Sequence, residues 1–247
     1  MWDDARQLNA IAVTLALIAC AFLAWAALGW VARLPLFAIR HVVVTTSPVR
    51  VNPAWVASVV RGDLSGTFFS MDLGAARAAF ARIPWVKSVA LRRQWPDRLE
   101  IELTEHQPLA RWNDQGLVDT DGAVFVASDA GELPEFDGPD GEAPAMVERY
   151  REWAPMLNGL SLKLTGLVLS PRGGWKIRTE GAGGPLTIEL GRDHVDERIE
   201  RFVAAWRLTI AALARDGRHV DHVDLRYRNG FAARLPDFRP KPAKRAT

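Results

Sequence analysis

Cysteine is almost absent from this 247-residue chain, because Cys20 is the only one. A single cysteine excludes an intramolecular disulfide and any zinc finger built on several cysteines. Neither sign of charge dominates, since 31 Lys and Arg residues face 29 Asp and Glu residues. The net charge of +2 gives no case for bulk nucleic-acid binding. With 49% hydrophobic residues, the composition indicates one or two globular domains.

Recognisable catalytic motifs are also missing. The sequence has no G-x-S-x-G, no P-loop, no G-x-G-x-x-G and no H-E-x-x-H. The best metal candidate is the run from His219 to His222, with Asp224 nearby. On a strand, His222 and Asp224 would share one face and His219 and Asp221 the other, so neither face collects three ligands. We therefore expect a protein that is not an enzyme and has no metal or cofactor.

One long hydrophobic run is present. Residues 10–31 read AIAVTLALIACAFLAWAALGWV, and as a helix they would span about 33 Å, enough for the hydrocarbon core of a bilayer. A cleaved signal peptide would have a shorter apolar core and a basic start. A lipoprotein signal, suggested by the sequence before Cys20, would turn polar after that cysteine. We expect an uncleaved transmembrane helix over 10–32 and a short tail over 1–9.

The charges beside this helix argue against translocation of the larger part. Arg6 precedes the helix, whereas Arg33, Arg40 and Arg50 follow it. Taken alone, the positive-inside rule would leave the C-terminal bulk in the cytoplasm. Large domains are translocated largely regardless of such charges, so the count does not decide the orientation.

The first region after the helix is predicted to be a β-α-α-β-β unit. Asn52-Pro53 and either Ser70 or Asp72 are typical helix starts. Trp95 to Arg98 forms a turn, in which we expect Trp95 to pack on the sheet and a neighbouring arginine to pair with Glu100 or Glu102. The predicted strands are 39–45, 86–94 and 99–104, and the predicted helices run through Trp55–Val60 and Leu73–Phe80.

The second region is predicted to be a mainly antiparallel β domain with a long amphipathic helix. Residues 128–145 read as a loop, and 146–157 as a helix. The long helix covers 193–214, with apolar residues at helical spacing. From Pro236 onward a basic, proline-containing tail should be disordered, and deleting 239–247 should change little. The predicted strands are 109–112, 117–119, 124–127, 160–170, 175–179, 186–190, 222–227 and 231–235.

Several runs in this order resemble the FtsQ/DivIB family of bacterial cell-division proteins. They are Ile83–Val86, Leu91–Leu99, Glu105–Trp112, Gly122–Phe125, Gly191-Arg192 and Val223–Ala232. The resemblance covers nearly the whole chain, and the W-P-D-x-L and D-L-R-Y-x-N-G runs are its most specific parts. It implies an α+β fold with a POTRA domain over 36–106 and a β domain over 107–235.

The resemblance also implies a function. Similar proteins keep the N-terminus in the cytoplasm and the bulk in the periplasm, in the inner membrane at the division septum. They are scaffolds that bind FtsB and FtsL and help control septal peptidoglycan synthesis. The alternatives are a membrane-anchored envelope enzyme or a POTRA-containing translocation component, but the sequence shows neither a convergent polar pocket nor room for a β-barrel.

Partner binding is expected at the last strand. A strand that ends a sheet leaves backbone groups unpaired, and a partner segment can add a strand there. The resemblance places the contact near Arg172, Arg226, Tyr227, Asn229 and Gly230, and Leu235, at the end of the last predicted strand, is expected to belong to it. The residues themselves leave other readings open, because Tyr227 could lie in the core and Arg226 could form an ion pair within the chain.

Overall fold

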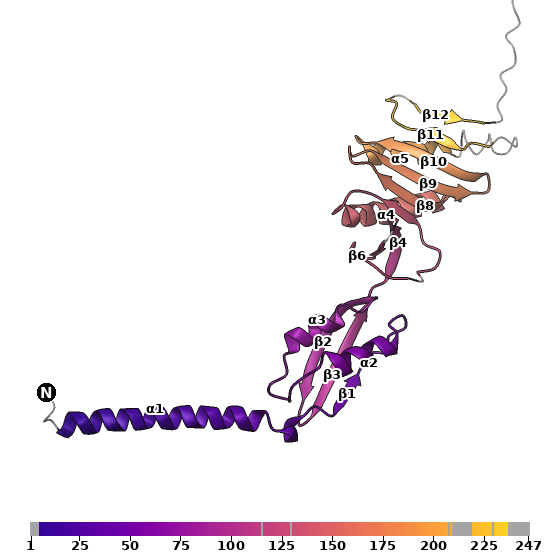
Figure 1. Ribbon diagram of the computed structural model, residues 1–247. Coiled ribbons are helices and arrows are strands. Elements are labelled where there is room, and N and C mark those ends of the chain that lie inside the picture. Colours follow the sequence, from indigo (N-terminus) through magenta and orange to yellow (C-terminus); the bar gives the residue numbers. More distant parts are fainter. Residues whose placement is uncertain are drawn as a thin grey trace, which may run out of the picture. The chain divides into compact units, whose positions relative to one another are not determined.

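The computed structural model describes residues 5–114, 116–128, 130–206, 208, 219–228 and 230–236. The chain forms two compact units, divided between Glu105 and His106. Figure 1 shows the order of their helices and strands along the chain. Each unit has its own sheet, so we describe the two separately.

The first unit begins with helix α1, Ala5–Ala32. Its segment Asn9–Ala32 is long and apolar enough to cross a membrane, and it is not buried against the rest of the protein. A short 3-10 helix, η1, follows at Pro35–Phe37. The expected transmembrane helix is therefore a continuous helix.

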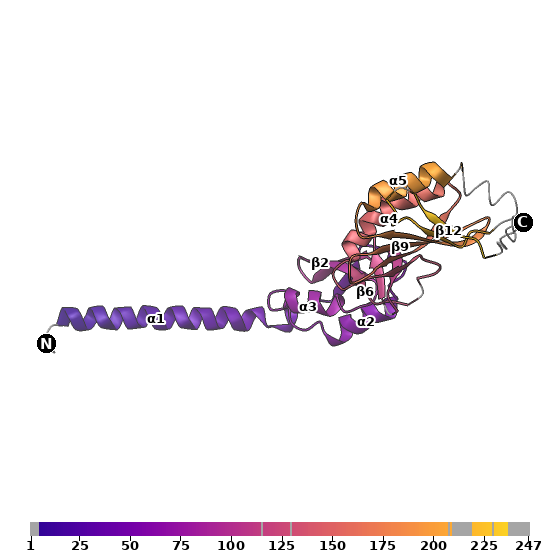
Figure 2. The same cartoon turned by 90° about the horizontal axis from the view of Figure 1, so that it is seen from above.

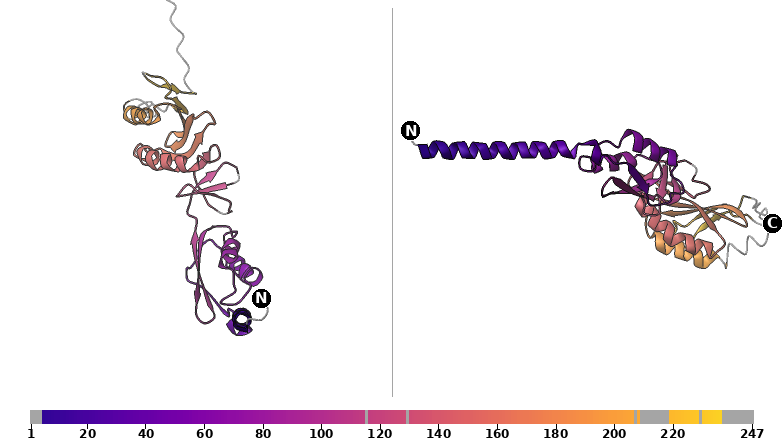
Figure 3. Two further views of the ribbon diagram at one scale, coloured as in Figure 1. Left: turned by 90° about the vertical axis from the view of Figure 1, so that its left-hand side faces the viewer. Right: turned by 90° about the horizontal axis from the view of Figure 1, so that it is seen from below.

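The rest of the first unit has the predicted β-α-α-β-β order. Its sheet runs β1-β3-β2, with β1 parallel and β2 antiparallel to the central β3. Both helices cover the same face of this sheet (Figure 3). The elements are β1 His41–Val44, α2 Pro53–Gly62, α3 Leu73–Phe80, β2 Val86–Gln94 and β3 Arg98–Glu105.

Local chemistry sets the two helix starts. The Asn52 side chain accepts a hydrogen bond from the Ala54 amide, and Pro53 is the first residue of α2. Of the two candidates for the second start, Asp72 is the cap, accepting from the amides of Gly74 and Ala75. These side chains satisfy amides that have no partner within a helix.

The Glu105 carboxylate binds the loop before α2 at the end of β3. Glu105, the last residue of β3, accepts hydrogen bonds from the amides of Val49, Arg50 and Val51 at 3.1, 2.8 and 2.7 Å. These bonds hold the loop before α2 against the end of the sheet. The apolar centre beneath the helices includes Phe80, Ile83, Leu99, Ile101 and Leu103.

The β2–β3 turn differs from the expectation. Trp95 does not pack on the sheet, because 73% of its surface is exposed. Arg92 lies directly opposite Glu100 in the strand register, whereas Arg93 turns away and donates to the Met71 carbonyl. The alternation of faces along β2 separates these two neighbouring arginines.

The second unit contains a nine-stranded mixed sheet. Its order is β12-β11-β10-β9-β8-β7-β4-β5-β6. Five neighbouring pairs are antiparallel and three are parallel, so the expected mainly antiparallel domain is confirmed. The strands are β4 Pro108–Trp112, β5 Gly116–Asp119, β6 Val124–Phe125, β7 Glu135–Asp137, β8 Lys163–Leu169, β9 Trp175–Gly181, β10 Gly184–Gly191, β11 His222–Asp224 and β12 Ala232–Arg234.

Two helices lie side by side on one face of this sheet (Figure 2). They are α4, Ala143–Asn158, and α5, Val195–Trp206. Trp153 and Phe202 are their largest fully buried side chains, and Phe136, Ile177 and Ile188 meet them from the strands. Burial of this apolar surface stabilises the unit.

Several predicted boundaries were wrong. The presumed loop 128–145 contains β7, which fits between β4 and β8, and the start of α4. Only Phe136 of β7 is buried, so three residues carried too weak an alternation to be recognised. The strand predicted over 222–227 ends at Asp224. Beyond Trp206, most of the long helix predicted to reach residue 214 lies outside the described residues, as does the tail after Pro236.

The Trp85 side chain provides a test of the first unit. It is 7% exposed, and the Arg50 guanidinium lies 4.7 Å from the ring centre. We expect Trp85→Ala to lower the free energy of unfolding by about 3–5 kcal/mol, because it removes a large buried side chain. Denaturant unfolding of the full chain in detergent measures this. Trp55→Ala is the matched control, since Trp55 is 57% exposed and should change little. An equal effect of the two substitutions would contradict the packing described here.

Candidate partner-binding edge

Strand β12 forms one edge of the nine-stranded sheet. It pairs with β11 through Val223↔Ala233 and the two flanking pairs, and within the described part of the chain no strand lies on its other side. Alternate backbone N–H and C=O groups on that outer side are thus available to another chain. The sequence placed this strand over 231–235, and the structure places it over Ala232–Arg234.

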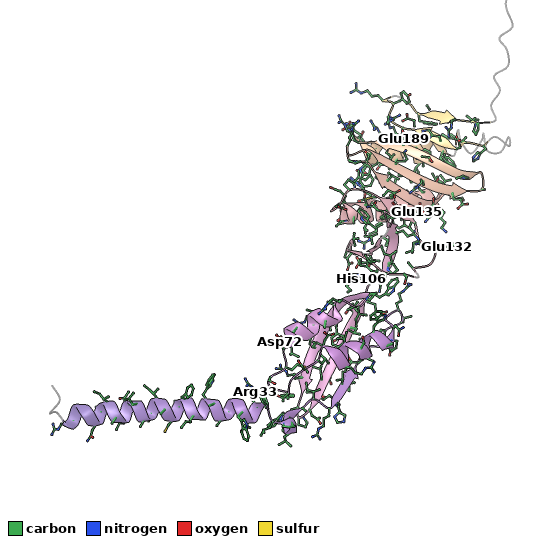
Figure 4. All side chains as sticks on the ribbon, viewed as in Figure 1. Arg33, Asp72, His106, Glu132, Glu135 and Glu189 are labelled. Atoms are coloured by element: carbon green, nitrogen blue, oxygen red, sulfur yellow. The ribbon has the colours of Figure 1, made fainter. Side chains whose placement is uncertain are left out.

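Beside this edge, Arg226 is held by two carboxylates. Its Nε donates to both oxygens of Asp224 at 2.9 and 3.1 Å, and its Nη2 donates to Asp224 Oδ2 at 2.6 Å. Nη2 also lies 3.3 Å from Glu189 Oε2 on β10. Figure 4 labels Glu189 in this part of the sheet. The ion pair within the chain, left open by the sequence, is therefore present.

The side chains of Asp224 and Arg226 differ in exposure. The Asp224 side chain is 12% exposed, whereas the Arg226 side chain is 59% exposed. Hydrogen bonds from Arg226 lower the pKa of the Asp224 carboxyl, against the opposing effect of its burial. The same pairing raises the pKa of Arg226. Asp224 thus stays ionised, and it fixes the direction of a cation that still faces solvent.

Tyr227 and Gly230 occupy the connection between β11 and β12. Tyr227 is 58% exposed, so it is not part of the core. Gly230 is exposed as well, and Asn229 lies outside the described residues. Helix α5 supports this connection, because Arg201 Nη1 donates to the Arg228 carbonyl at 2.8 Å.

The same helix borders a cavity that the sequence did not reveal. The cavity has a volume of about 430 Å³ and opens beside β12. Arg198 and Arg201 lie three residues apart on α5, a spacing that places them on the same side of the helix. That spacing could have indicated a basic site on this helix. The lining residues are Arg198, Arg201, Ala205, Leu225, Gly230 and Phe231.

Arg172 comes from a different turn but reaches the same end of the sheet. It is exposed in the turn between β8 and β9. A Cβ atom built on Gly173 would lie 3.9 Å from Arg192 Cβ, and one built on the preceding Gly191 would lie 3.1 Å from Arg226 Cγ. These distances place the turn of Arg172, the end of β10 and Arg226 at the same end of the sheet.

Leu235 lies at the opposite end of β12. Because β11 and β12 are antiparallel, Asp224 faces Ala232, and Leu235 follows Arg234 at the far end. Leu235 is half-buried and packs against the hydrophobic core. Arg172, Arg226, Tyr227 and Gly230 therefore lie at one end of the sheet, and Leu235 lies at the other end of β12.

His106 and His41 each pair with an aspartate. His106 Nδ1 lies 2.8 Å from the buried Asp119, and His41 Nδ1 lies 3.3 Å from Asp97. In the run that first suggested a metal, Asp221 is bound by Arg234 at 2.9 and 2.7 Å, which lowers the pKa of that carboxyl. Among the described residues, no three His, Cys, Asp or Glu side chains are grouped to hold a metal ion.

The helix that can span a membrane, followed by the β-α-α-β-β unit and the large β unit, defines a membrane-anchored protein of the POTRA class. The family model of the FtsQ-type POTRA domain matches residues 37–106. The model of the C-terminal part of cell division protein FtsQ/DivIB matches residues 110–226.

Individual relatives agree with these family models. A cell division protein FtsQ from Burkholderia pseudomallei is 37% identical, over 97% of this chain and 96% of its own. The FtsQ of Bordetella pertussis is 36% identical over 98% and 96%, and that of Escherichia coli is 32% identical over 90% and 81%. The chain belongs to the FtsQ family of cell division proteins.

The pairing of Asp224 with Arg226 predicts how stability depends on pH. A carboxyl whose pKa is lowered in the folded state adds stability that is fully present above its ordinary pKa of 3.8. That stability is lost as the pH falls through the lower folded pKa. We expect an NMR titration of the full chain in detergent micelles to give a midpoint for Asp224 below 3.8, and we expect Arg226→Ala to raise it.

The control for this titration is Arg149→Ala, which removes an arginine that pairs with Glu152 and Asp196 elsewhere in the same unit. It should leave the Asp224 midpoint unchanged. An Asp224 midpoint that is the same with and without Arg226 would contradict the electrostatic account of this edge.

Proposed function

We propose that this chain is a non-enzymatic scaffold of the division machinery that binds the periplasmic segments of FtsB and FtsL at strand β12. The N-terminus would lie in the cytoplasm, and both folded units in the periplasm at the septum, where the complex helps control peptidoglycan synthesis. Membership of the FtsQ family supports the role in division. The observation that carries the proposed site is the open outer side of β12, together with the exposed Arg226 and Tyr227 on the connection that leads from β11 into β12.

The backbone of β12 supplies the first part of the binding. Its hydrogen bonds to β11 use one side of the strand, so an extended partner segment can pair with the other side. In this mode main-chain hydrogen bonds give affinity, and side chains beside the strand give specificity. Such pairing needs an edge strand whose outer side is free. Among the described residues, no strand lies on the outer side of β12.

Arg226 supplies the second part. Its bonds to Asp224 and Glu189 run through Nε and Nη2, and within the described chain Nη1 makes no further bond. The internal pair therefore holds the guanidinium in place while one nitrogen remains available to a partner carboxylate. An exposed ion pair contributes about 0–1 kcal/mol, whereas truncating one member of a buried interfacial pair costs about 2–5 kcal/mol.

Tyr227 tests the proposed interface more directly than Arg226 does. Its ring is exposed and is not part of the core, so its removal should leave the fold intact. Tyrosine is frequent among residues that dominate binding energies, because it combines a large apolar ring with a polar tip. Arg226→Ala, in contrast, also leaves the nearly buried Asp224 unpaired and must be accompanied by a melting curve.

We expect Tyr227→Ala to weaken binding at least about tenfold, which corresponds to about 1.4 kcal/mol. The full chain in nanodiscs is titrated with the periplasmic segment of FtsB from the same organism, and separately with the FtsB–FtsL pair. Arg149→Ala is the matched control and should bind like the unchanged chain. Equal affinity of Tyr227→Ala, with an unchanged melting temperature, would remove Tyr227 from the interface.

Proline substitutions distinguish strand addition from contacts made by side chains alone. Proline has no N–H and is tolerated in an edge strand only where that N–H would face away from the sheet. Ala232→Pro and Ala233→Pro place it at consecutive positions, whose N–H groups point to opposite sides. We expect one variant to melt normally and to lose FtsB binding. Normal binding by the normally melting variant would exclude strand addition.

A further inference from the structure

Large apolar side chains gather where the first unit follows the membrane helix. We call them the aromatic end, and it comprises Leu36, Phe37, Phe68, Phe69 and Trp95. Phe69 contacts Phe37 and Phe68, with ring centres 5.1 and 5.3 Å apart. Leu36 and Phe69 are largely exposed, and so is Trp95, which does not pack on the sheet.

Hydrogen bonds attach the loop that carries Phe68 and Phe69 to the end of α1. The Thr67 hydroxyl donates to the carbonyl of Ala32, the last residue of that helix, at 2.5 Å. The Phe68 amide donates to the Phe37 carbonyl at 2.7 Å, and Ala38 and Thr67 form a β-bridge. Although it is 35 residues away in sequence, this loop therefore sits where the membrane helix ends.

The turn that carries Trp95 is attached to the same segment. The amides of Arg40 and His41 both donate to the Asp97 carbonyl, at 2.9 and 3.3 Å. His41 also pairs with the Asp97 carboxylate. Arg40 is eight residues after Ala32, so even a fully extended linker places it within about 29 Å of the end of the helix.

The residue types fit a membrane surface. Tryptophan and other aromatic side chains concentrate at the boundary between lipid and water. Arg33, labelled at the end of α1 in Figure 4, and Arg40 are exposed cations that can pair with lipid phosphates. An exposed apolar group in water is unfavourable, but at this place in the chain a membrane is within reach to cover it.

We propose that the aromatic end is a second membrane contact, in which Phe69 and Trp95 enter the interfacial layer of the bilayer beside the point where α1 leaves it. The lipid contact would restrict the tilt and rotation of the POTRA unit relative to the membrane. It requires only the membrane anchor, and not the binding of FtsB or FtsL. It also accounts for an exposed tryptophan between two well-paired strands.

Lipid-borne quenchers test this contact in the full chain. In a Cys20→Ala background, a fluorophore is attached through Ser65→Cys, at an exposed position beside the loop. The protein is reconstituted in vesicles of phosphatidylethanolamine and phosphatidylglycerol with a nitroxide at a shallow acyl position. We expect strong quenching, most of which is lost in the Phe69→Ala/Trp95→Ala double variant.

Two controls separate this contact from simple tethering and from unfolding. Trp55→Ala removes an equally large exposed ring near the opposite end of the unit and should keep the quenching. A label at Val49, bonded to Glu105 at the far end of β3, should not be quenched. Because Phe69 contacts other rings, Trp95→Ala is also measured alone, and it should lower the quenching without changing the melting temperature.

Two results would contradict the proposed membrane contact. Weak quenching at Ser65 in the unchanged chain, or the same quenching in the double variant and in Trp55→Ala, would overturn the proposal. Vesicles in which phosphatidylcholine replaces phosphatidylglycerol report on the two arginines. Loss of quenching there, together with unchanged quenching in the double variant, would assign the contact to charge alone and would contradict the role of the aromatic rings.

Discussion

The charge of Asp224 is the constraint on which the partner-binding edge depends. This carboxylate is nearly buried at the end of β11, and a buried charge needs a partner. Arg226 supplies it through Nε and Nη2 and is thereby fixed at the start of the connection from β11 to β12. A flexible arginine would lose more side-chain freedom on binding, so an arginine fixed in advance favours association. One ion pair thus serves both the fold and the proposed interface.

Much of the fold could be predicted because its signals are local. Asn52 and Asp72 cap helices through contacts two or three residues away, and the alternation of residues 99–104 identified β3. Strand β7 could not be recognised, since it is held by β4 and β8 on either side. The exposure of Trp95 was also not predicted, because a large apolar side chain in a turn is ordinarily expected to pack on the protein.

The candidate site shows the same limit. The sequence identified the β11–β12 connection, but it could not show that Arg226 also reaches Glu189 of β10, 37 positions away. The cavity beside β12 depends on how α5 lies across the sheet. Contacts between residues distant in sequence require the register of the whole sheet, which no local pattern specifies. Family resemblance named a candidate region, and the structure shows which contacts hold its side chains.

Hydrogen exchange at β12 tests the central claim most directly. The amides of Ala232, Ala233 and Arg234 are compared in the full chain alone and with the periplasmic segment of FtsB. Strand addition predicts that an amide facing away from β11 exchanges quickly alone and is strongly protected in the complex. A complex that forms without new protection in β12 would contradict the account, and it would move the interface to another surface of the chain.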